Sequence, residues 1–242
     1  MEEQTTLKIG IFDADGTLFD TVDSVTKVFA DIIFKRYGLD EKTSERFFKE
    51  TGGLALDQQF KLLLMNEAGM ILENEETNEM AEELRERIKD FPTPLFAEAI
   101  ETAKLLYEIL GCRLFISSNA RQDRLNARVV RHMHPNYFSV WLGTDREVKI
   151  KKGIGHLMYF AGNLGLTPYD FFARAFFVSD GPPDMRLALK YGILPIGIAT
   201  SVSADMLREA GAQFVISSLS ELPDLIKDFN TRVLAIGPRP TA

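Results

Sequence analysis

The chain has 242 residues, and the 45% that are apolar can fill one large domain, or a core domain with a smaller partner. With 28 Lys and Arg against 35 Asp and Glu, its net charge of -7 disfavours a nucleic-acid partner. No apolar run approaches the roughly 20 residues that cross a bilayer, and the acidic start differs from a signal peptide. We therefore expect a cytoplasmic protein without a membrane partner. Its single cysteine, Cys112, excludes an internal disulfide.

Six short apolar runs predict the strands of a sheet. They cover residues 7–12, 113–117, 139–143, 175–179, 194–199 and 214–216. Helical patterns of about a dozen residues precede or follow these runs. Strands that alternate with helices predict an α/β fold with a mostly parallel sheet covered on both faces.

The interval 22–90 breaks this alternation, because it holds several helical patterns and no convincing strand. A helix is predicted to start at Val22, and others over 55–68 and 75–89. A further amphipathic helix, 96–110, returns the chain to the sheet and ends at Gly111. We expect residues 22–90 to form an inserted helical unit, and residues 1–21 and 91–242 to form the sheet domain.

Polar residues follow three of the strands, at the sheet edge where functional groups gather in parallel α/β folds. They are Asp13, Asp15, Ser118, Asn119, Asp180 and Asp184, with Lys151 and Lys152 between the third and fourth strands. Carboxylates that converge on one edge repel each other, and a hard cation such as Mg²⁺ relieves that repulsion. The sequence therefore predicts a magnesium site.

The same residues match the needs of phosphoryl transfer. Asp13 is the candidate nucleophile, which would form an aspartyl phosphate. Asp15 can protonate the leaving oxygen and then activate water. Ser118 and Lys152 can bind the phosphoryl oxygens.

Four segments resemble the motifs of the haloacid dehalogenase-like hydrolases. They are residues 11–20 (Ile-Phe-Asp-Ala-Asp-Gly-Thr-Leu-Phe-Asp), residues 116–119 (Ile-Ser-Ser-Asn), the lysine, and residues 178–184 (Val-Ser-Asp-Gly-Pro-Pro-Asp). The resemblance spans nearly the whole chain. It implies a Rossmann-like catalytic core with residues 22–90 as a C1 cap, as in phosphoglycolate phosphatases and beta-phosphoglucomutases. It also implies a small phosphorylated metabolite as substrate.

The resemblance further implies a set of ligands. Asp13, the backbone carbonyl of Asp15 and Asp180 would hold Mg²⁺, with Asp184 in that shell or just behind it. The phosphate would be bound by Ser118, Asn119 and Lys152. One departure is Ser179, which stands where the fourth motif usually has glycine.

Two assignments require a choice between neighbours. Nothing in one sequence separates Lys151 from Lys152, but the glycine and the helix that follow favour Lys152. We choose Ser118 over Ser117 because neighbouring strand residues face opposite sides and Ser118 precedes the asparagine, as the family pattern asks.

Three other features allow a structural interpretation. The arginines at 121, 124, 128 and 131 are expected along one solvated side of a helix. His132 and His134 are expected at the surface, because residues two apart do not share a helix face. The segment 51–53 (Thr-Gly-Gly) is either a connector between helices or a loop that reaches the substrate.

Functions other than that of a phosphatase are also compatible with this fold. A dehalogenase has no leaving oxygen to protonate and needs no carboxylate at Asp15. A phosphomutase would keep both aspartates, and a regulatory module would use Asp13 only as a phosphoacceptor. We favour a magnesium-dependent phosphatase, with those two as alternatives.

Overall fold

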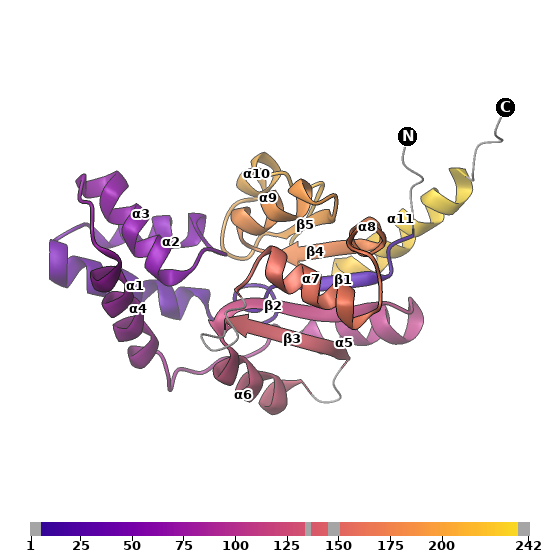
Figure 1. Cartoon of the computed structure of the whole chain (residues 1–242), viewed down its shortest axis with the longest axis horizontal. Coiled ribbons are helices and arrows are strands. Elements are labelled where there is room, and N and C mark those ends of the chain that lie inside the picture. Colours follow the sequence, from indigo (N-terminus) through magenta and orange to yellow (C-terminus); the bar gives the residue numbers. More distant parts are fainter. Residues whose placement is uncertain (1–5, 134–136, 145–150, 237–242) are drawn as a thin grey trace.

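The computed structural model of the chain describes residues 6–133, 137–144 and 151–236. At its centre is a six-stranded sheet in which every neighbouring pair of strands is parallel (Figure 1). In spatial order the strands are β3 (Phe138–Thr144), β2 (Arg113–Arg121), β1 (Ile9–Phe12), β4 (Ala175–Ser179), β5 (Leu194–Ile198) and β6 (Phe214–Ile216). This order is that of a Rossmann-type sheet, whose functional edge lies at the carboxyl ends of the strands. The predicted α/β class is confirmed.

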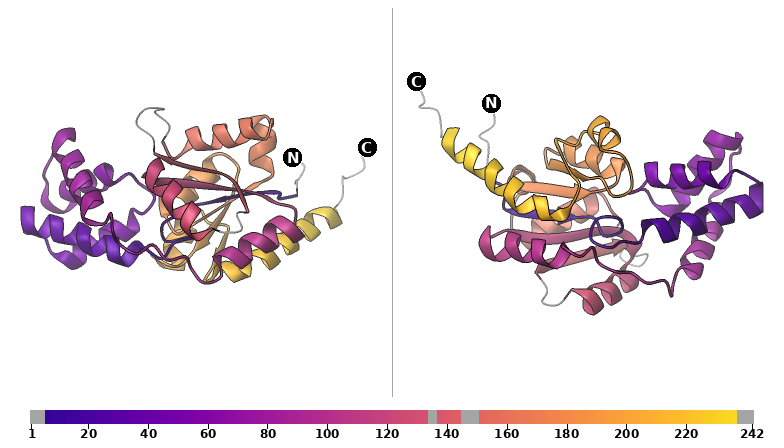
Figure 2. Two further views of the ribbon diagram at one scale, coloured as in Figure 1. Left: turned by 90° about the horizontal axis from the view of Figure 1, so that it is seen from below. Right: turned by 180° about the vertical axis from the view of Figure 1, so that it is seen from behind.

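Helices cover both faces of the sheet, as the alternating pattern predicts (Figure 2). One face packs against α5 (Ala99–Lys104), α6 (Gln122–His132) and α11 (Leu222–Ile236), with the short η2 (Leu219–Glu221) leading into α11. The other packs against α7 (Ile154–Asn163), α8 (Pro168–Ala173) and α9 (Pro182–Lys190), and α10 (Ala204–Glu209) packs beside α9. Because side chains alternate along a strand, Ile11 enters one core and Phe12 the other.

Two predicted elements differ in detail. The helix expected over 96–110 is α5 followed directly by a π-helical turn, η1 (Leu105–Ile109), and Gly111 ends it with a φ of 65°. Strand β2 is longer than predicted and includes Ser118, Asn119 and Arg121. Cys112, just before β2, is buried, and this burial raises the pKa of its thiol to about 11, so the side chain only packs.

The segment 22–90 contains α1 (Val22–Tyr37), α2 (Glu41–Glu50), α3 (Leu56–Ala68) and α4 (Asn74–Arg87). Phe29, Phe60 and Leu84 belong to a core of its own, separate from the two cores beside the sheet. In Figure 1 these helices lie together at one end of the molecule, beyond the carboxyl ends of the strands. We call this unit the helical insert.

The two connections between the helical insert and the sheet domain run side by side. The amide of Asp20 donates to the carbonyl of Pro94 at 2.9 Å, and the amide of Phe96 donates to the carbonyl of Leu18 at 3.0 Å. The helical insert is therefore anchored at one narrow place, next to the strand ends. Among the described residues, no helix has both the length and the apolar character needed to span a membrane.

Candidate active site

Three neighbouring strands deliver the candidate residues to one place. Asp13 follows β1, Ser118 lies near the end of β2, and Asp180 follows β4, and these strands are adjacent in the order β2-β1-β4. The amide of Asp13 donates to the carbonyl of Val178 at 3.0 Å, which continues the β1–β4 pairing past the end of the strand. The parallel sheet thus brings together residues more than a hundred positions apart.

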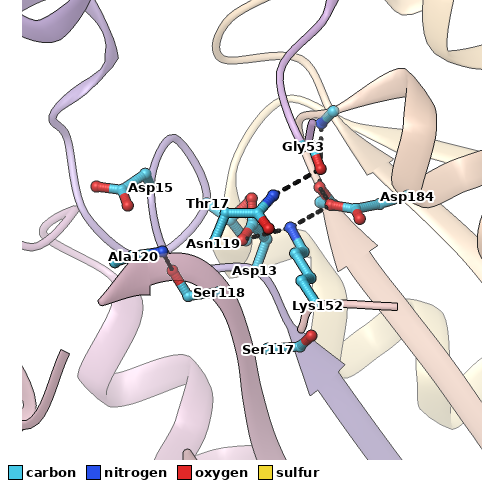
Figure 3. A network of polar contacts seen from close by, with 12 residues as sticks. Asp13, Asp15, Thr17, Gly53, Ser117, Ser118, Asn119, Ala120, Lys152 and Asp184 are labelled. Carbon is cyan, nitrogen blue, oxygen red and sulfur yellow. Dashed lines mark hydrogen bonds and ion pairs between the residues drawn. The ribbon is translucent and has the colours of Figure 1, made fainter. Parts of the chain in front are cut away.

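Lys152 lies between two carboxylates at this edge (Figure 3). Its Nζ is 2.8 Å from Oδ1 of Asp13 and 2.7 Å from Oδ2 of Asp184, and its side chain is only 3% exposed. Lys151 is exposed. The structure therefore places Lys152, and not Lys151, among the acidic side chains.

Burial and charge perturb the titration of these groups. Burial, with the nearby charges of Asp184 and Asp180, raises the pKa of Asp13 to about 8 against the opposing effect of Lys152. Burial also raises the pKa of Asp180 to about 6. Burial alone would lower the pKa of Lys152, but the Asp13 and Asp184 charges outweigh it and hold that pKa above its usual value. The site therefore strongly disfavours the ionised form of its buried carboxylates.

Hydroxyl groups orient the two carboxylates that follow β4. Oγ1 of Thr17 donates to Oδ1 of Asp180 at 3.2 Å, and the hydroxyl of Ser201 donates to Oδ2 of the same residue. Oγ of Ser179 donates to Oδ2 of Asp184 at 2.6 Å and accepts from the Gly181 amide at 3.0 Å. The serine that departs from the family motif thus fixes Asp184.

The donor chemistry fits a divalent cation. The carboxylates of Asp13, Asp180 and Asp184 are buried around the single ammonium of Lys152, which leaves two negative charges unbalanced when all are ionised. In the described part of the chain no three Asp, Glu, His or Cys side chains are grouped as a metal site. Magnesium does not need such a group, because it takes one or two carboxylates with water and phosphate oxygens. Asp13 and Asp180 with a backbone carbonyl are therefore a sufficient donor set.

The two serines of β2 have different surroundings. Ser118 lines the cavity above the strand ends, and its Oγ accepts from the Ala120 amide at 3.0 Å. Ser117 turns the other way, and its Oγ lies 2.9 Å from Nδ1 of the buried His156. Only Ser118 is placed to meet a ligand.

Asn119 links the sheet domain to the helical insert, a role that the sequence did not indicate. Its Nδ2 donates to the carbonyl of Gly53 at 2.7 Å (Figure 3). An amide nitrogen has two hydrogens, so one remains for another acceptor.

Asp15 lies to one side of the Asp13–Lys152 group (Figure 3). Its Oδ1 accepts from Oγ1 of Thr21 at 2.6 Å and from Arg128 at 2.7 Å. Within the described residues its Oδ2 makes no hydrogen bond, so that oxygen is free to carry a proton.

The segment 51–53 rests on the sheet domain. A Cβ on Gly181 would lie 2.4 Å from the carbonyl oxygen of Gly52, and a Cβ on Gly53 would lie 3.3 Å from Oδ2 of Asp184. Gln59 of α3 supports the segment, because its Nε2 donates to the Thr51 carbonyl at 2.9 Å. The loop therefore packs on the turn after β4 and the carboxylate of Asp184, and it lines the cavity beside them.

A cavity of about 130 Å³ lies between the helical insert and the strand ends. One water molecule needs roughly 10–15 Å³ by this measure, so the cavity accepts a small molecule. Its floor includes Asp13, Asp15, Ser118, Asn119, Lys152 and Asp180. The sequence-predicted residues are thus brought to one cavity, except Asp184, which lies behind Lys152.

The expectation of a solvated arginine face is wrong for Arg124 and Arg128, which are partly buried, whereas Arg121 and Arg131 are exposed. Arg121 is at the end of β2 and not within the helix, while Arg124 and Arg128 are on α6, and all three line the cavity. Leu125 and Val129 anchor α6 in the core. Arg124 and Arg128 directly precede these two apolar residues, so they lie at the border of the buried face. Their position next to Leu125 and Val129 is the sequence signal that could have indicated partial burial.

Of the two histidines of the same region, His132 is described by the structure, and it does not line the cavity. His132 is partly buried, with its ring 6.2 Å from that of Phe19. His134 lies outside the described residues.

Comparison with known proteins identifies the family. Residues 10–198 match the family model described as haloacid dehalogenase-like hydrolase. A protein of Clostridium perfringens, provisionally named the pyrophosphatase PpaX, is 24% identical over 226 residues, which cover 93% of this chain and all of that protein.

Solved structures share the fold at low identity. A protein described as a predicted phosphatase, from Clostridium acetobutylicum, is similar with a TM-score of 0.74 at 20% identity, covering 93% of this chain and 100% of its own. A provisionally named beta-phosphoglucomutase from Bacteroides vulgatus is similar with a TM-score of 0.72 at 22% identity. The match covers 96% of this chain and 92% of that protein's chain. Together with the match over residues 10–198, the shared fold confirms the resemblance of the four motifs: the chain belongs to the haloacid dehalogenase-like hydrolases.

Proposed function

We propose that this hydrolase is a magnesium-dependent phosphatase of small phosphorylated metabolites, which acts through an aspartyl phosphate on Asp13. The observation that carries the proposal is the buried ammonium of Lys152, 2.8 Å from Asp13, in a cavity that also holds Ser118 and Asp180. A nucleophile, a cation beside it and hydrogen-bond donors facing the same space are what phosphoryl transfer needs. The provisional names of the relatives, a pyrophosphatase and a phosphatase, agree with this chemistry.

Each residue has one role in the proposal. A carboxylate oxygen of Asp13 attacks phosphorus, and the bond from phosphorus to the leaving oxygen breaks. Asp15 donates its proton to that oxygen, and the resulting carboxylate then takes a proton from the water that attacks the aspartyl phosphate. Lys152, Ser118 and the remaining amide hydrogen of Asn119 bind the phosphoryl oxygens.

The metal completes the charge balance. Asp13, the backbone carbonyl of Asp15 and Asp180 would hold Mg²⁺, and Asp184 orients Lys152 behind them. When bound, the ion supplies positive charge that offsets the repulsion between the carboxylates and the incoming phosphate.

The helical insert limits the substrate to small molecules. Its loop 51–53 contacts Asp184 and lines the cavity, which measures about 130 Å³. A lid of this kind excludes bulk water and leaves no path for a folded protein or a duplex.

The test is phosphate release from aryl phosphates, sugar phosphates, phosphoglycolate, nucleotides and acyl phosphates, measured with Mg²⁺, with Ca²⁺ and with a chelator. We expect turnover with Mg²⁺ alone, because the looser coordination of Ca²⁺ misplaces the phosphoryl group. Undiminished turnover in chelator would contradict the metal assignment. Faster turnover of phosphopeptides than of every small phosphate would contradict the lid argument.

The same assay separates the alternatives. Isomerisation of a sugar phosphate without phosphate release would identify a phosphomutase. Stable phosphorylation of Asp13 without turnover would identify a regulatory phosphoacceptor.

A further inference from the structure

The cavity is lined by cationic side chains, and most of them are already paired. The pairs are Lys49 with Asp23, Arg85 with Glu82, Arg121 with Asp123, Arg128 with Asp15, and Lys152 with Asp13 and Asp184. Arg124 also lines the cavity. Over residues 6–133, 137–144 and 151–236, no carboxylate lies within ion-pair distance of its guanidinium. Arg124 is therefore a cation without a partner, facing the space where the substrate would bind.

The surroundings of Arg124 make this lack of a partner unfavourable. The residue is half-buried, and its burial, followed by the charges of Arg128 and Arg121, lowers the pKa of its guanidinium below the usual value. The charges of Asp123 and then Glu86 act in the opposite direction, but the first carboxylate is bonded to Arg121 and the second to Lys89. Like charges four residues apart on a helix repel each other, so a bound anion would relieve this arrangement.

We propose that Arg124, flanked by Arg121 and Arg128, binds a second anionic group of the substrate. The enzyme would then select phosphate monoesters that also carry a carboxylate or a second phosphoryl group. This inference rests on the proposed function, since it assigns the non-reacting end of the same substrate. A guanidinium presents its donors in a planar fork that fits either group with two parallel hydrogen bonds.

The position of Arg124 sets the length of that substrate. Arg128 contacts Asp15, the proposed acid, at 2.7 Å. Arg124 precedes it by one turn of α6, about 6 Å along the helix axis. It also lies in the first turn of the helix, where the macrodipole favours an anion. The second anion would thus lie only a few atoms from the phosphate that is transferred.

The opposite wall of the cavity competes less for this group, because it is mainly apolar and its two cations are already paired. The helical insert contributes apolar side chains there, among them Val22, Val25, Phe48, Leu56, Leu84 and Ile88. Its cations, Lys49 and Arg85, are bound to Asp23 and Glu82. An anionic end is therefore directed to α6, while the carbon skeleton meets the helical insert.

The test compares matched substrates in the wild type and in Arg124→Met. The pair 3-phosphoglycerate and glycerol 3-phosphate differs in a carboxylate, and the pair fructose 1,6-bisphosphate and fructose 6-phosphate differs in a phosphoryl group. We expect the wild type to favour the doubly anionic member of at least one pair. In the variant its kcat/KM should fall roughly 10- to 100-fold, the effect of losing a charge-assisted hydrogen bond, mainly through KM. The singly charged members should change less than about twofold.

Two further variants make the result specific. Arg131→Met removes the same charge from the exposed end of α6 and should leave the preference unchanged. Arg124→Lys keeps the positive charge but lacks the planar fork of guanidinium donors, so it should retain part of the preference for doubly anionic substrates. Equal losses on both members of each pair, or an equal effect of Arg131→Met, would overturn the proposal.

Binding separates this inference from the proposed function. Titration calorimetry of the same two substrate pairs reads the role of Arg124 even without turnover. Loss in Arg124→Met of a difference in affinity that the wild type shows supports the inference. Absence of any difference within both pairs in the wild type overturns it, whatever the assay for phosphate release gives.

Discussion

Asp15 shows how one carboxylate can be held and still be available for proton transfer. Thr21 and Arg128 both donate to Oδ1, at 2.6 and 2.7 Å, and within the described residues Oδ2 has no hydrogen-bond partner. A proton on Oδ2 would then meet the leaving oxygen of a substrate bound at Asp13. The arrangement gives the proposed acid a defined position through one oxygen and its function through the other.

Asp15→Asn should keep the fold and lose this proton transfer. We expect kcat for an alkyl phosphate to fall roughly 10²- to 10⁴-fold, the usual contribution of general acid–base catalysis. The loss should be smaller for an aryl phosphate, whose acidic leaving group departs without a proton. Steady-state kinetics on the two substrates check this, and equal losses would remove Asp15 from the role of the acid.

His156 is a buried titratable side chain beneath the site. Its Nδ1 lies 2.9 Å from Oγ of Ser117, and its Nε2 has no hydrogen-bond partner in the described part of the chain. Burial, followed by the charge of Lys152, lowers its pKa from 6.5 to about 4. The imidazole is therefore neutral in the folded protein at neutral pH.

This depressed pKa predicts how stability depends on pH. Between about pH 6.5 and 4 the unfolded chain binds a proton that the folded protein does not, so the free energy of unfolding falls as the pH falls. The contribution is up to roughly 3 kcal/mol, and it is absent above pH 6.5. Denaturant unfolding at several pH values should show a flatter dependence in His156→Gln. Identical pH dependence in the two proteins would contradict this account.

At the scale of elements, the strand ends could be predicted and the helix orientations could not. Asp13, Ser118 and Asp180 follow apolar runs, and parallel strands bring such ends to one edge of the sheet, where the adjacent β2, β1 and β4 place them together. The direction of α6 depends on how Leu125 and Val129 pack in the core, and that packing involves residues remote in sequence. The arginines beside them therefore looked like an ordinary charged helix face.

The two choices between neighbouring residues differ in how far the sequence could decide them. A lysine pair in sequence gives no orientation, and the fold buries Lys152 while it exposes Lys151. The choice between Ser117 and Ser118 could be made from the sequence, because side chains alternate along a strand. Ser117 accordingly faces His156, and Ser118 faces the cavity.

The contact between the loop 51–53 and the turn after β4 can be tested by one methyl group. In Gly181→Ala the new Cβ would lie 2.4 Å from the carbonyl oxygen of Gly52, although the φ of -95° suits alanine. The helical insert must then shift away from the strand ends. We expect kcat/KM for small phosphates to fall at least tenfold, as for comparable misplacements of catalytic groups, and small-angle scattering to report a more extended molecule.

Gly162→Ala is the matched control. Gly162 is an exposed residue of α7, and nothing lies within 4 Å of its added Cβ. Activity should be unchanged and stability equal or greater by up to about 1 kcal/mol, from helix propensity. Wild-type activity and scattering in Gly181→Ala would show that the loop contact does not position the helical insert.

At the scale of the whole molecule, the net charge and the local charge differ in sign. The chain carries -7, yet four arginines, Lys49 and Lys152 line the cavity. Overall charge disfavours extended polyanions, while the cations of the cavity favour a small one. The sequence total therefore predicted the absence of nucleic-acid binding but not the cationic wall, which depends on the placement of α6.

The two parts of the molecule contribute different groups to the cavity. The sheet domain supplies the carboxylates, Lys152 and three arginines, and the helical insert supplies a mainly apolar wall, Lys49, Arg85 and the loop 51–53. The two connections run together at Asp20 and Pro94, so one hinge can move the whole helical insert. In the proposed function, substrate entry and catalysis would then depend on a single closure.

The most direct test of this account is magnesium-supported hydrolysis of an aryl phosphate by Asp13→Asn beside the wild type. The substitution keeps the shape of the side chain and removes the charge that attacks phosphorus. Circular dichroism and thermal unfolding confirm that the variant is folded. The account predicts that the folded variant has no measurable turnover; turnover at the wild-type rate would contradict Asp13 as the nucleophile.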